Sequence, residues 1–398
     1  MENMEDAIKT ISESLKYELG LYIHVPFCER KCAYCGFLST DKKLSFDKRE
    51  FCEAVVRELE IAAASLDDEF KIDTVFLGGG TPSLLDHGDL EVLSRIKEQL
   101  TFSTDLEFTM EANPNSLQEQ LIPEYRNFGI TRISMGVQSF DDSVLRTLGR
   151  LHTAQQAIGK YKLLRECGLY DLSIDLMFGA PGQTLEQWQE DVKKAIELQP
   201  DHISFYGLQL ERGTPFYEEY RLDRMDLPDE DTERAMYHHA VDEFKKAGYE
   251  HYEISNCARP GKKCRHNMKY WHMDDFIGIG PGASSYIYPV RFKNTDDIEK
   301  WYNLVNEGNS PCDFDTYHTE TPEESMGIFC FTALRTAEGI ELAEFRDMFD
   351  MDFFQAYPDK AEMIVSWCRK GLMRMSDSRI TLTEKGIDVS NDIMCEFV

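Results

Sequence analysis

Short apolar stretches alternate with amphipathic ones along the first 250 residues of the chain. Six apolar stretches predict strands, at residues 21–25, 74–77, 106–110, 133–137, 172–178 and 202–210. Helical spacing of apolar residues predicts helices over 45–66 (with Ser45 as N-cap), 90–100, 117–128, 141–148, 153–167, 184–198 and 231–247. Strands that alternate with helices call for a parallel sheet, and six such units suit an incomplete (β/α)6 TIM-like barrel better than a closed eight-unit one.

The pattern changes at about residue 322. Helices are expected over 323–334, 340–349 and 357–370, followed by a hairpin of 372–375 with 380–382 and a last helix from Glu384. This order predicts a small winged-helix-like α+β domain. The expected division is an N-terminal extension (1–20), a barrel (21–250), a connecting segment (251–320) and a C-terminal domain (321–398).

The polar and glycine residues of the barrel fall where its strands end. Gly78–Thr81 follow the second strand, Glu111 ends the third and Gln138 ends the fourth. Chemistry gathers at this end of the strands in barrels, although a glycine run is often a simple turn and Glu111 could be a surface carboxylate. Asp175 lies inside an apolar strand, where a buried carboxylate needs a partner or a ligand.

Three cysteines lie close together after the first strand, as Cys28, Cys32 and Cys35 in a C-x3-C-x2-C pattern. A thioredoxin-like pair would leave Cys28 unexplained, and a structural zinc site usually takes four ligands. Unrelated buried thiols rarely cluster in this way. A [4Fe-4S] cluster held by three thiolates keeps one iron open to another molecule, and we favour this interpretation.

The cysteine pattern, with Tyr34 before its last member, resembles the radical S-adenosylmethionine (SAM) superfamily. The phrase YIHVPFC at 22–28 is similar to the HemN/HemW group, which contains oxygen-independent coproporphyrinogen III oxidases and haem chaperones. The resemblance implies that Cys28, Cys32 and Cys35 hold the cluster. It also implies that SAM chelates the fourth iron and that reduction cleaves SAM to a 5'-deoxyadenosyl radical.

The same resemblance assigns further cofactor contacts, and no catalytic side chain. The expected contacts with SAM or the cluster are Tyr22, Tyr34, Gly79, Gly80, Thr81, Glu111, Gln138, Arg150, Asp175 and, by a weaker alignment, Gln209.

The segment His266-Asn267-x-x-Tyr270-Trp271 resembles a motif associated with haem in HemW-type sequences. A histidine can ligate haem iron, and Tyr270 or Trp271 can stack on a porphyrin, although a lone histidine is more often structural. Cys257, Cys264 and His266 fit no common zinc pattern. The G-x-G-x-x-A string at 278–283 is followed by no expected helix, and we discount a dinucleotide site.

The amino-acid composition excludes some classes of binding partner. A formal net charge of -29 argues against binding to nucleic acid or to an anionic membrane. The chain has no apolar run long enough to span a bilayer, and its first residues are too acidic for a targeting peptide. Eleven cysteines in 398 residues are too few for a disulfide scaffold, and a cytoplasmic location is expected.

Two functions fit the resemblance: a haem chaperone that retains the SAM site, and an oxidase that decarboxylates coproporphyrinogen III. Phe37 occupies the position where the oxidases have a fourth cysteine, and the chain has only about twenty residues before the motif. Both features favour the chaperone, with a haem-accepting protein and an electron donor as expected partners. Gly36 departs from the aspartate expected in many HemW sequences.

Overall fold

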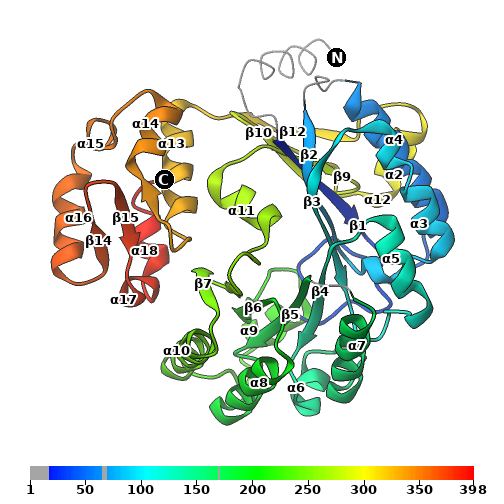
Figure 1. The fold of residues 1–398 in the computed structure, drawn as a ribbon, viewed down its shortest axis with the longest axis horizontal. Coiled ribbons are helices and arrows are strands. Elements are labelled where there is room, and N and C mark those ends of the chain that lie inside the picture. The colour runs from blue at the N-terminus through cyan, green and yellow to red at the C-terminus, as the bar shows by residue number, and fades with distance from the viewer. Residues whose placement is uncertain (1–17, 65–69, 169–170) are drawn as a thin grey trace.

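The computed structural model describes residues 18–64, 70–168 and 171–398 (Figure 1). Residues 1–17 of the predicted N-terminal extension therefore lie outside the described residues, as do the last two residues of the helix expected over 45–66. Residues 18–20 belong to the first strand.

Six parallel strands form the centre of the molecule. They are β1 (Glu18–Val25), β2 (Lys71–Gly79), β3 (Phe102–Ala112), β4 (Arg132–Gln138), β5 (Asp171–Phe178) and β6 (His202–Gly207). Each pairs in parallel with the next in chain order. All six predicted strands are confirmed, and the open strand order confirms the partial barrel.

Six further strands extend this sheet at both edges, and the sequence did not predict them. They are β7 (Glu250–Glu253), β8 (Asn256–Ala258), β9 (Phe276–Ile279), β10 (Ser284–Ile287), β11 (Val290–Asn294) and β12 (Cys312–Thr319). The order is β12-β11-β10-β9-β1-β2-β3-β4-β5-β6-β8-β7. Most of these strands are only three to five residues long, too short for a clear alternation. The predicted connecting segment, residues 251–320, thus contributes strands to the same sheet. The domain boundaries themselves remain predictions.

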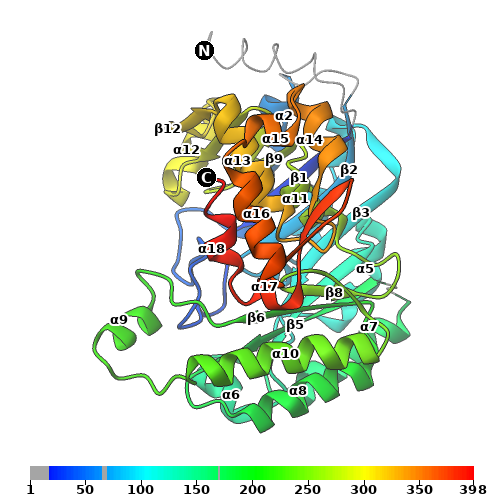
Figure 2. The ribbon, with the colours of Figure 1, turned by 90° about the vertical axis from the view of Figure 1, so that its left-hand side faces the viewer.

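Helices cover the outer face of the sheet (Figures 1 and 2). The helices of this part of the chain are α2 (Lys48–Ala63), α3 (His87–Leu93), α4 (Ile96–Gln99), α5 (Ile122–Phe128), α6 (Asp142–Thr147), α7 (Ala154–Glu166), α8 (Leu185–Leu198), α9 (Pro215–Arg221), α10 (Glu230–Lys246), α11 (Arg265–His272) and α12 (Ile298–Asn306), with 3-10 turns at Pro82–Leu84 and Glu119–Leu121. Helix α11 is the exception to the outer layer, since it lies on the inner side of the curved sheet (Figure 1). The helix expected over 90–100 is divided into α3 and α4.

The predicted N-cap of α2 was wrong. Asp47 caps this helix, because its carboxylate accepts the Glu50 N–H while the Glu50 side chain accepts the Asp47 N–H. Ser45 instead donates its backbone N–H to Glu299 at 2.7 Å. A carboxylate three residues before Glu50 completes a capping box, which Ser45 is too far away to form.

The C-terminal domain forms a separate body beside the barrel (Figure 1). It consists of α13 (Pro322–Ala333), β13 (Ile340–Glu341), α14 (Leu342–Phe349), α15 (Phe353–Ala356), α16 (Lys360–Arg369), β14 (Met373–Met375), β15 (Arg379–Leu382), α17 (Glu384–Ile387) and α18 (Ser390–Met394). Its three strands pair in the order β13-β15-β14, and its core around Phe345 and Phe353 also includes Met273 and Tyr286 from the neighbouring sheet region. These elements confirm the predicted α+β domain.

Within residues 18–64, 70–168 and 171–398, we find no helix long and apolar enough to cross a membrane.

Candidate functional site

The C-terminal ends of β2 to β5 meet the cysteine loop that follows β1 around a pocket of about 120 Å³. The predicted residues that line it are Cys28, Cys32, Tyr34, Cys35, Gly79, Gly80, Thr81, Glu111, Gln138, Arg150 and Asp175. The structure therefore brings together eleven residues that are spread over 148 positions of the sequence. Parallel strands end at one edge of a sheet, which is the reason for this convergence.

The cysteine loop is held in place by its own backbone. The Cys28 N–H donates to the Thr40 carbonyl at 3.0 Å, and the Thr40 N–H donates to the Pro26 carbonyl at 2.8 Å. Cys28, Cys32 and Cys35 are all partly exposed to the pocket and form no disulfide. Burial raises the pKa of the Cys35 thiol above its ordinary value, and binding to iron offsets that penalty by stabilising the thiolate.

The donor set fits an iron-sulfur cluster. In the described part of the chain, no three histidine, cysteine or acidic side chains are gathered tightly enough to hold a single metal ion. A cubane takes each of its protein thiolates at a different iron, so its ligands need not converge on one point. Three thiols on one pocket, unpaired with one another, suit the cluster better than they suit zinc.

Gly79 and Gly80 let two segments approach closely. The Gly80 N–H donates to the Val25 carbonyl, and the Thr81 N–H donates to the Phe27 carbonyl, both at 2.7 Å. A Cβ on Gly80 would lie 2.6 Å from the Phe27 oxygen. Gly79 has φ of 105°, which favours glycine. The triplet therefore fixes the end of β2 directly against the start of the cysteine loop.

Glu111 and Asp175 place two carboxyl groups in the same pocket. Glu111 accepts the Gly79 N–H at 3.0 Å, and Asp175 accepts the Ser134 hydroxyl at 2.8 Å. Burial, together with the charge of Asp175, raises the pKa of Glu111 to about 7. Burial also raises the pKa of Asp175, although hydrogen bonds oppose it. A ligand that presents an ammonium or hydroxyl groups would relieve this unfavourable burial.

Arg150 brings a guanidinium against one of the thiols in this pocket. Its guanidinium lies 3.6 Å from the Cys32 sulfur and donates to the Gly136 carbonyl at 2.6 Å. It also donates to the Asn113 side chain. Arg150 thus places a fixed positive charge directly beside the Cys32 sulfur.

Gln138 and Tyr34 complete the walls. Gln138 has φ of 68° at the end of β4 and accepts the Tyr206 hydroxyl at 3.1 Å. This backbone conformation is uncommon for a residue other than glycine, asparagine or aspartate, and it turns the chain at the rim of the pocket. The Tyr34 ring packs 6.4 Å from that of Phe216.

Two predicted contacts, Tyr22 and Gln209, lie outside this pocket, and the Thr81 hydroxyl faces Cys28 and Asn113. Tyr22 does not line the pocket; its hydroxyl hydrogen bonds to His24 Nδ1 at 2.9 Å, behind Gly79. Thr81 lines the pocket but its hydroxyl lies 3.6 Å from the Cys28 sulfur and accepts from Asn113 at 3.0 Å. Gln209 lines only a second, deeper cavity.

Asn113, Ser134 and Tyr206 belong to the site but were not predicted from the sequence. Asn113 follows Glu111 by two residues, and Tyr206 lies near the end of β6, so strand-end position was the signal that could have found them. Ser134 points inward from the middle of β4, where alternation alone does not distinguish a pocket from a core.

The second cavity has a volume of about 620 Å³ and lies inside the barrel. It shares Tyr34, Cys35, Phe37, Glu111, Ser134, Asp175 and Tyr206 with the smaller pocket. Its remaining walls include Phe76, Arg132, Met177, His202, Asn256, Cys264 and Asn267. The two spaces are therefore adjacent, with the carboxyl groups at their common boundary.

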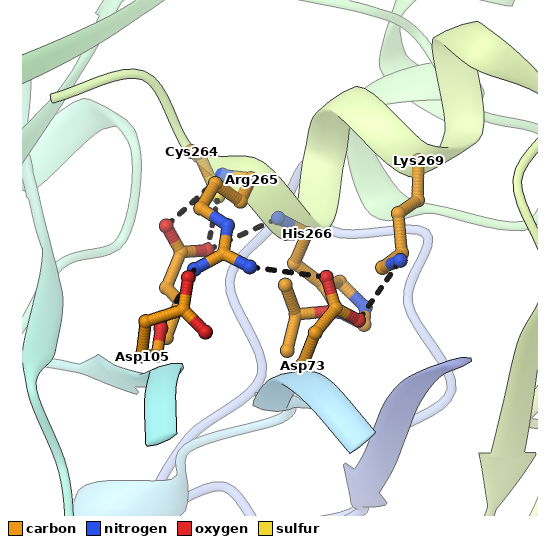
Figure 3. Close-up of polar contacts among 8 residues, drawn as sticks. Asp73, Asp105, Cys264, Arg265, His266 and Lys269 are labelled. Carbon is orange, nitrogen blue, oxygen red and sulfur yellow. Dashed lines mark hydrogen bonds and ion pairs between the residues drawn. The ribbon is translucent and has the colours of Figure 1, made fainter. Parts of the chain in front are cut away.

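The helix α11 carries the HNxxYW motif. Figure 3 shows the polar contacts that join the start of this helix to Asp73 and Asp105. Glu107 accepts the backbone N–H groups of Arg265 and His266, each at 3.0 Å. The Arg265 side chain pairs with Asp73 and Asp105, and Lys269 lies 2.9 Å from Asp73. These contacts fix α11 to the N-terminal ends of β2 and β3.

His266 is fully buried beneath this helix. Its Nδ1 hydrogen bonds to the Thr74 hydroxyl and its Nε2 to the Tyr270 hydroxyl, each at 2.9 Å. The ring stacks on Phe76 with centroids 5.3 Å apart. Burial lowers the pKa of His266 to about 3, so the imidazole is neutral. Both nitrogens that could ligate iron are thus engaged inside the protein.

The aromatic residues of the motif also pack internally. The Tyr270 ring lies 4.7 Å from that of Phe276, and the Arg335 guanidinium lies 4.5 Å from the centre of the Trp271 ring. Cys264 contacts Glu107, while Cys257 is buried in strand β8. Neither cysteine joins His266 in a metal-binding group within the residues described.

Comparisons with known proteins cover almost the whole chain. Residues 22–195 match the model of the radical SAM superfamily, and residues 321–389 match that of the HemN C-terminal domain. A Lactococcus lactis protein named heme chaperone HemW is 34% identical over 381 residues, which cover 95% of this chain and 96% of that protein. A Haemophilus influenzae protein of the same name is 39% identical over 341 residues, covering 83% and 85%.

The fold is similar to that of coproporphyrinogen III oxidase (HemN) from Escherichia coli, described as a radical SAM enzyme. The TM-score is 0.85 over 98% of this chain and 92% of the other, with 22% sequence identity. At 22% identity, this structural match supports the fold alone. The family is established by the sequence relatives, which are 34% and 39% identical.

Proposed function

The chain belongs to the HemW family of radical SAM proteins, and from this premise we propose that it is a haem chaperone that carries a [4Fe-4S] cluster and binds SAM. The observation that carries the proposal is identity of 34% to a heme chaperone HemW along 95% of the chain, joined to three thiols on one pocket. Membership of the superfamily implies the cluster and SAM.

Cys28, Cys32 and Cys35 would hold the cluster in this proposal. When reduced, the bound cluster supplies the electron that cleaves SAM. Arg150 keeps positive charge beside Cys32, and Thr81 contacts Cys28, so both side chains position thiolates. Gly79 and Gly80 allow the end of β2 to lie directly against His24, Val25 and Phe27, which holds the cluster loop beside the pocket.

Glu111, Gln138 and Asp175 provide the polar wall for SAM. The carboxyl groups accept hydrogen bonds, which suits the ammonium and the ribose hydroxyls of that molecule. The raised pKa of Glu111, about 7, means that a cationic ligand would bind best when the carboxyl is ionised. Affinity for SAM should accordingly rise as pH increases through about 7.

The alternative activity is oxidation of coproporphyrinogen III. Phe37 stands where the oxidases have a fourth cysteine, and its side chain is 65% exposed at the rim of both cavities. The likeness to the oxidase is a likeness of fold at 22% identity. These observations favour the chaperone.

His266, Tyr270 and Trp271 stay predictions as haem contacts. For His266 to ligate iron, the imidazole would have to give up its hydrogen bond to Thr74 or to Tyr270. The expected partners are a haem-accepting protein and an electron donor, and we propose that they meet in the cytoplasm. Eleven unpaired cysteines in the described residues agree with a reducing compartment.

The deciding experiment uses anaerobically reconstituted protein. One arm titrates haem while the Soret band is followed, and the other supplies SAM, a reductant and coproporphyrinogen III. Saturable haem binding without protoporphyrinogen IX supports the chaperone. Formation of protoporphyrinogen IX without a saturable haem spectrum would overturn it.

A second measurement addresses the ligand. His266→Ala is compared with His87→Ala, whose imidazole lies on the surface. An altered Soret maximum in the first variant alone would support iron ligation. An unchanged spectrum and affinity would remove His266 from the haem site and leave the chaperone proposal standing.

A further inference from the structure

A buried arginine lines the floor of the 620 Å³ cavity without a full set of partners. Arg132 begins strand β4, and only 3% of the residue is exposed. Within the described residues its guanidinium makes one hydrogen bond, from Nη1 to the Lys262 carbonyl at 3.4 Å. Its Nε is buried with no partner at all. Buried polar groups are normally satisfied, and a buried cation with an unpaired N–H is costly.

The neighbouring carboxylates have other partners. Glu107 accepts two backbone N–H groups at the start of α11, and Asp171 pairs with Lys262. Asp175 lines the same cavity but is held by Ser134 and Ser173. Among the residues described, none of these groups forms an ion pair with Arg132. No ion pair with these carboxylates therefore fixes the guanidinium in place, although the nearby charges of Glu107, Asp171 and Asp175 act on it.

A second buried atom in the same cavity lacks a partner. The Asn256 Oδ1 accepts no hydrogen bond within the described chain, although the Nδ2 of the same side chain donates to Glu253. Asn267 from α11 also lines this end of the cavity. This oxygen is an acceptor and cannot pair with an anion, so a site for a carboxylate rests on Arg132 and not on Asn256.

We propose that Arg132 binds a carboxylate of a molecule that fills the barrel cavity, and that this carboxylate is a propionate of haem. That the molecule is haem follows from the proposed function. That it presents a carboxylate follows from the residues that line the cavity. The planar guanidinium can form a bidentate salt bridge with a carboxylate.

The dimensions and surfaces of the cavity suit such a ligand. Its volume of about 620 Å³ lies within the range of small-molecule sites. Phe37, Phe76 and Met177 give it apolar walls, and Arg132 lies at the far end from the cysteine loop. The exposed Phe37 and Gln209 stand at its rim, where a large flat molecule could enter. An amphipathic molecule would place its apolar body between these walls and its carboxylate on the floor.

The test compares haem with haem dimethyl ester, in which both propionates are blocked. Reconstituted wild-type protein should bind haem about tenfold more tightly than the ester, or better, because a charge-assisted pair is lost. Arg132→Met should lower haem affinity to that of the ester and leave ester affinity unchanged. Arg132→Lys should recover part of the difference, and the exposed Arg346→Met should behave as wild type.

Each outcome has one meaning. Equal wild-type affinities for haem and ester would overturn the role of Arg132 while leaving the haem proposal intact. Saturable binding of neither compound would overturn both together. Iron content and SAM calorimetry of each variant show whether the barrel is intact. If Arg132→Met fails to fold, the wild-type comparison of the two compounds and the Arg132→Lys variant still decide the question.

Discussion

Gly80→Ala tests whether the glycine triplet holds the cluster loop in place. The added methyl would lie 2.6 Å from the Phe27 carbonyl oxygen and 2.7 Å from the Val25 carbonyl oxygen. Both obstacles are backbone atoms, so neither can rotate away. The steric clash can be relieved only if the end of β2 moves away from the segment that leads into Cys28.

The cost follows from the two contacts. Separation would lengthen the hydrogen bonds from Gly80 to Val25 and from Thr81 to Phe27, now 2.7 Å each. Overpacking typically costs about 1 to 3 kcal/mol, and each weakened hydrogen bond adds up to about 1 kcal/mol. We therefore expect Gly80→Ala to lower the free energy of unfolding by about 2 to 4 kcal/mol and to reduce cluster occupancy.

The assay measures denaturant midpoints by circular dichroism, and iron and sulfide per chain after anaerobic reconstitution. Gly159→Ala is the matched control, because a Cβ there meets nothing within 4 Å and the residue lies inside helix α7. That variant should be neutral or slightly more stable, since alanine favours a helix. If Gly80→Ala keeps both the midpoint and the iron content of wild type, the close-approach argument is refuted.

Further predictions concern the cluster, SAM and a buried acid. Replacing Cys28, Cys32 and Cys35 together by alanine should abolish the cluster; normal iron, sulfide and electron paramagnetic resonance signals would contradict the ligand assignment. Glu111→Ala should weaken SAM binding about tenfold or more in calorimetry, because a charge-assisted contact is lost, and an unchanged affinity would remove Glu111 from the site. Glu58 is buried and its pKa is raised to about 7 by burial, so the stability it contributes should be lost as pH rises from about 4.5 through about 7. This loss of stability amounts to about 3 kcal/mol. Denaturant titrations at several pH values should show the loss in wild type but not in Glu58→Gln. If the stability of both proteins depends on pH in the same way, the prediction is refuted.

Much of the barrel could be predicted from local pattern. The strands β1 to β6 are apolar runs separated by amphipathic helices, so their existence and order follow from the chain alone. The positions of Cys28, Glu111 and Gln138 at strand ends were equally visible. Parallel pairing then requires those ends to meet, which is why most of the predicted residues line one pocket.

The strands at the edges of the sheet could not be predicted in this way. β9 is a short segment whose parallel partner, β1, lies more than 250 residues earlier. Its stability comes from that pairing and from neighbouring hydrogen bonds, and not from its own composition. Only the folded chain decides which edge receives it.

Side-chain environments were also decided by the tertiary structure. His266 was noted in the sequence as an imidazole beside aromatic residues, yet its surroundings come from Thr74 and Phe76, nearly two hundred positions away. The sequence did not indicate a buried position for Arg132, because a charged residue at the start of a strand is usually solvated. The sequence alone determined which chemical groups the chain has and which strand ends carry them. Burial and pairing across distant segments, which no local pattern encodes, determined that one histidine is enclosed and one arginine is left open to a cavity.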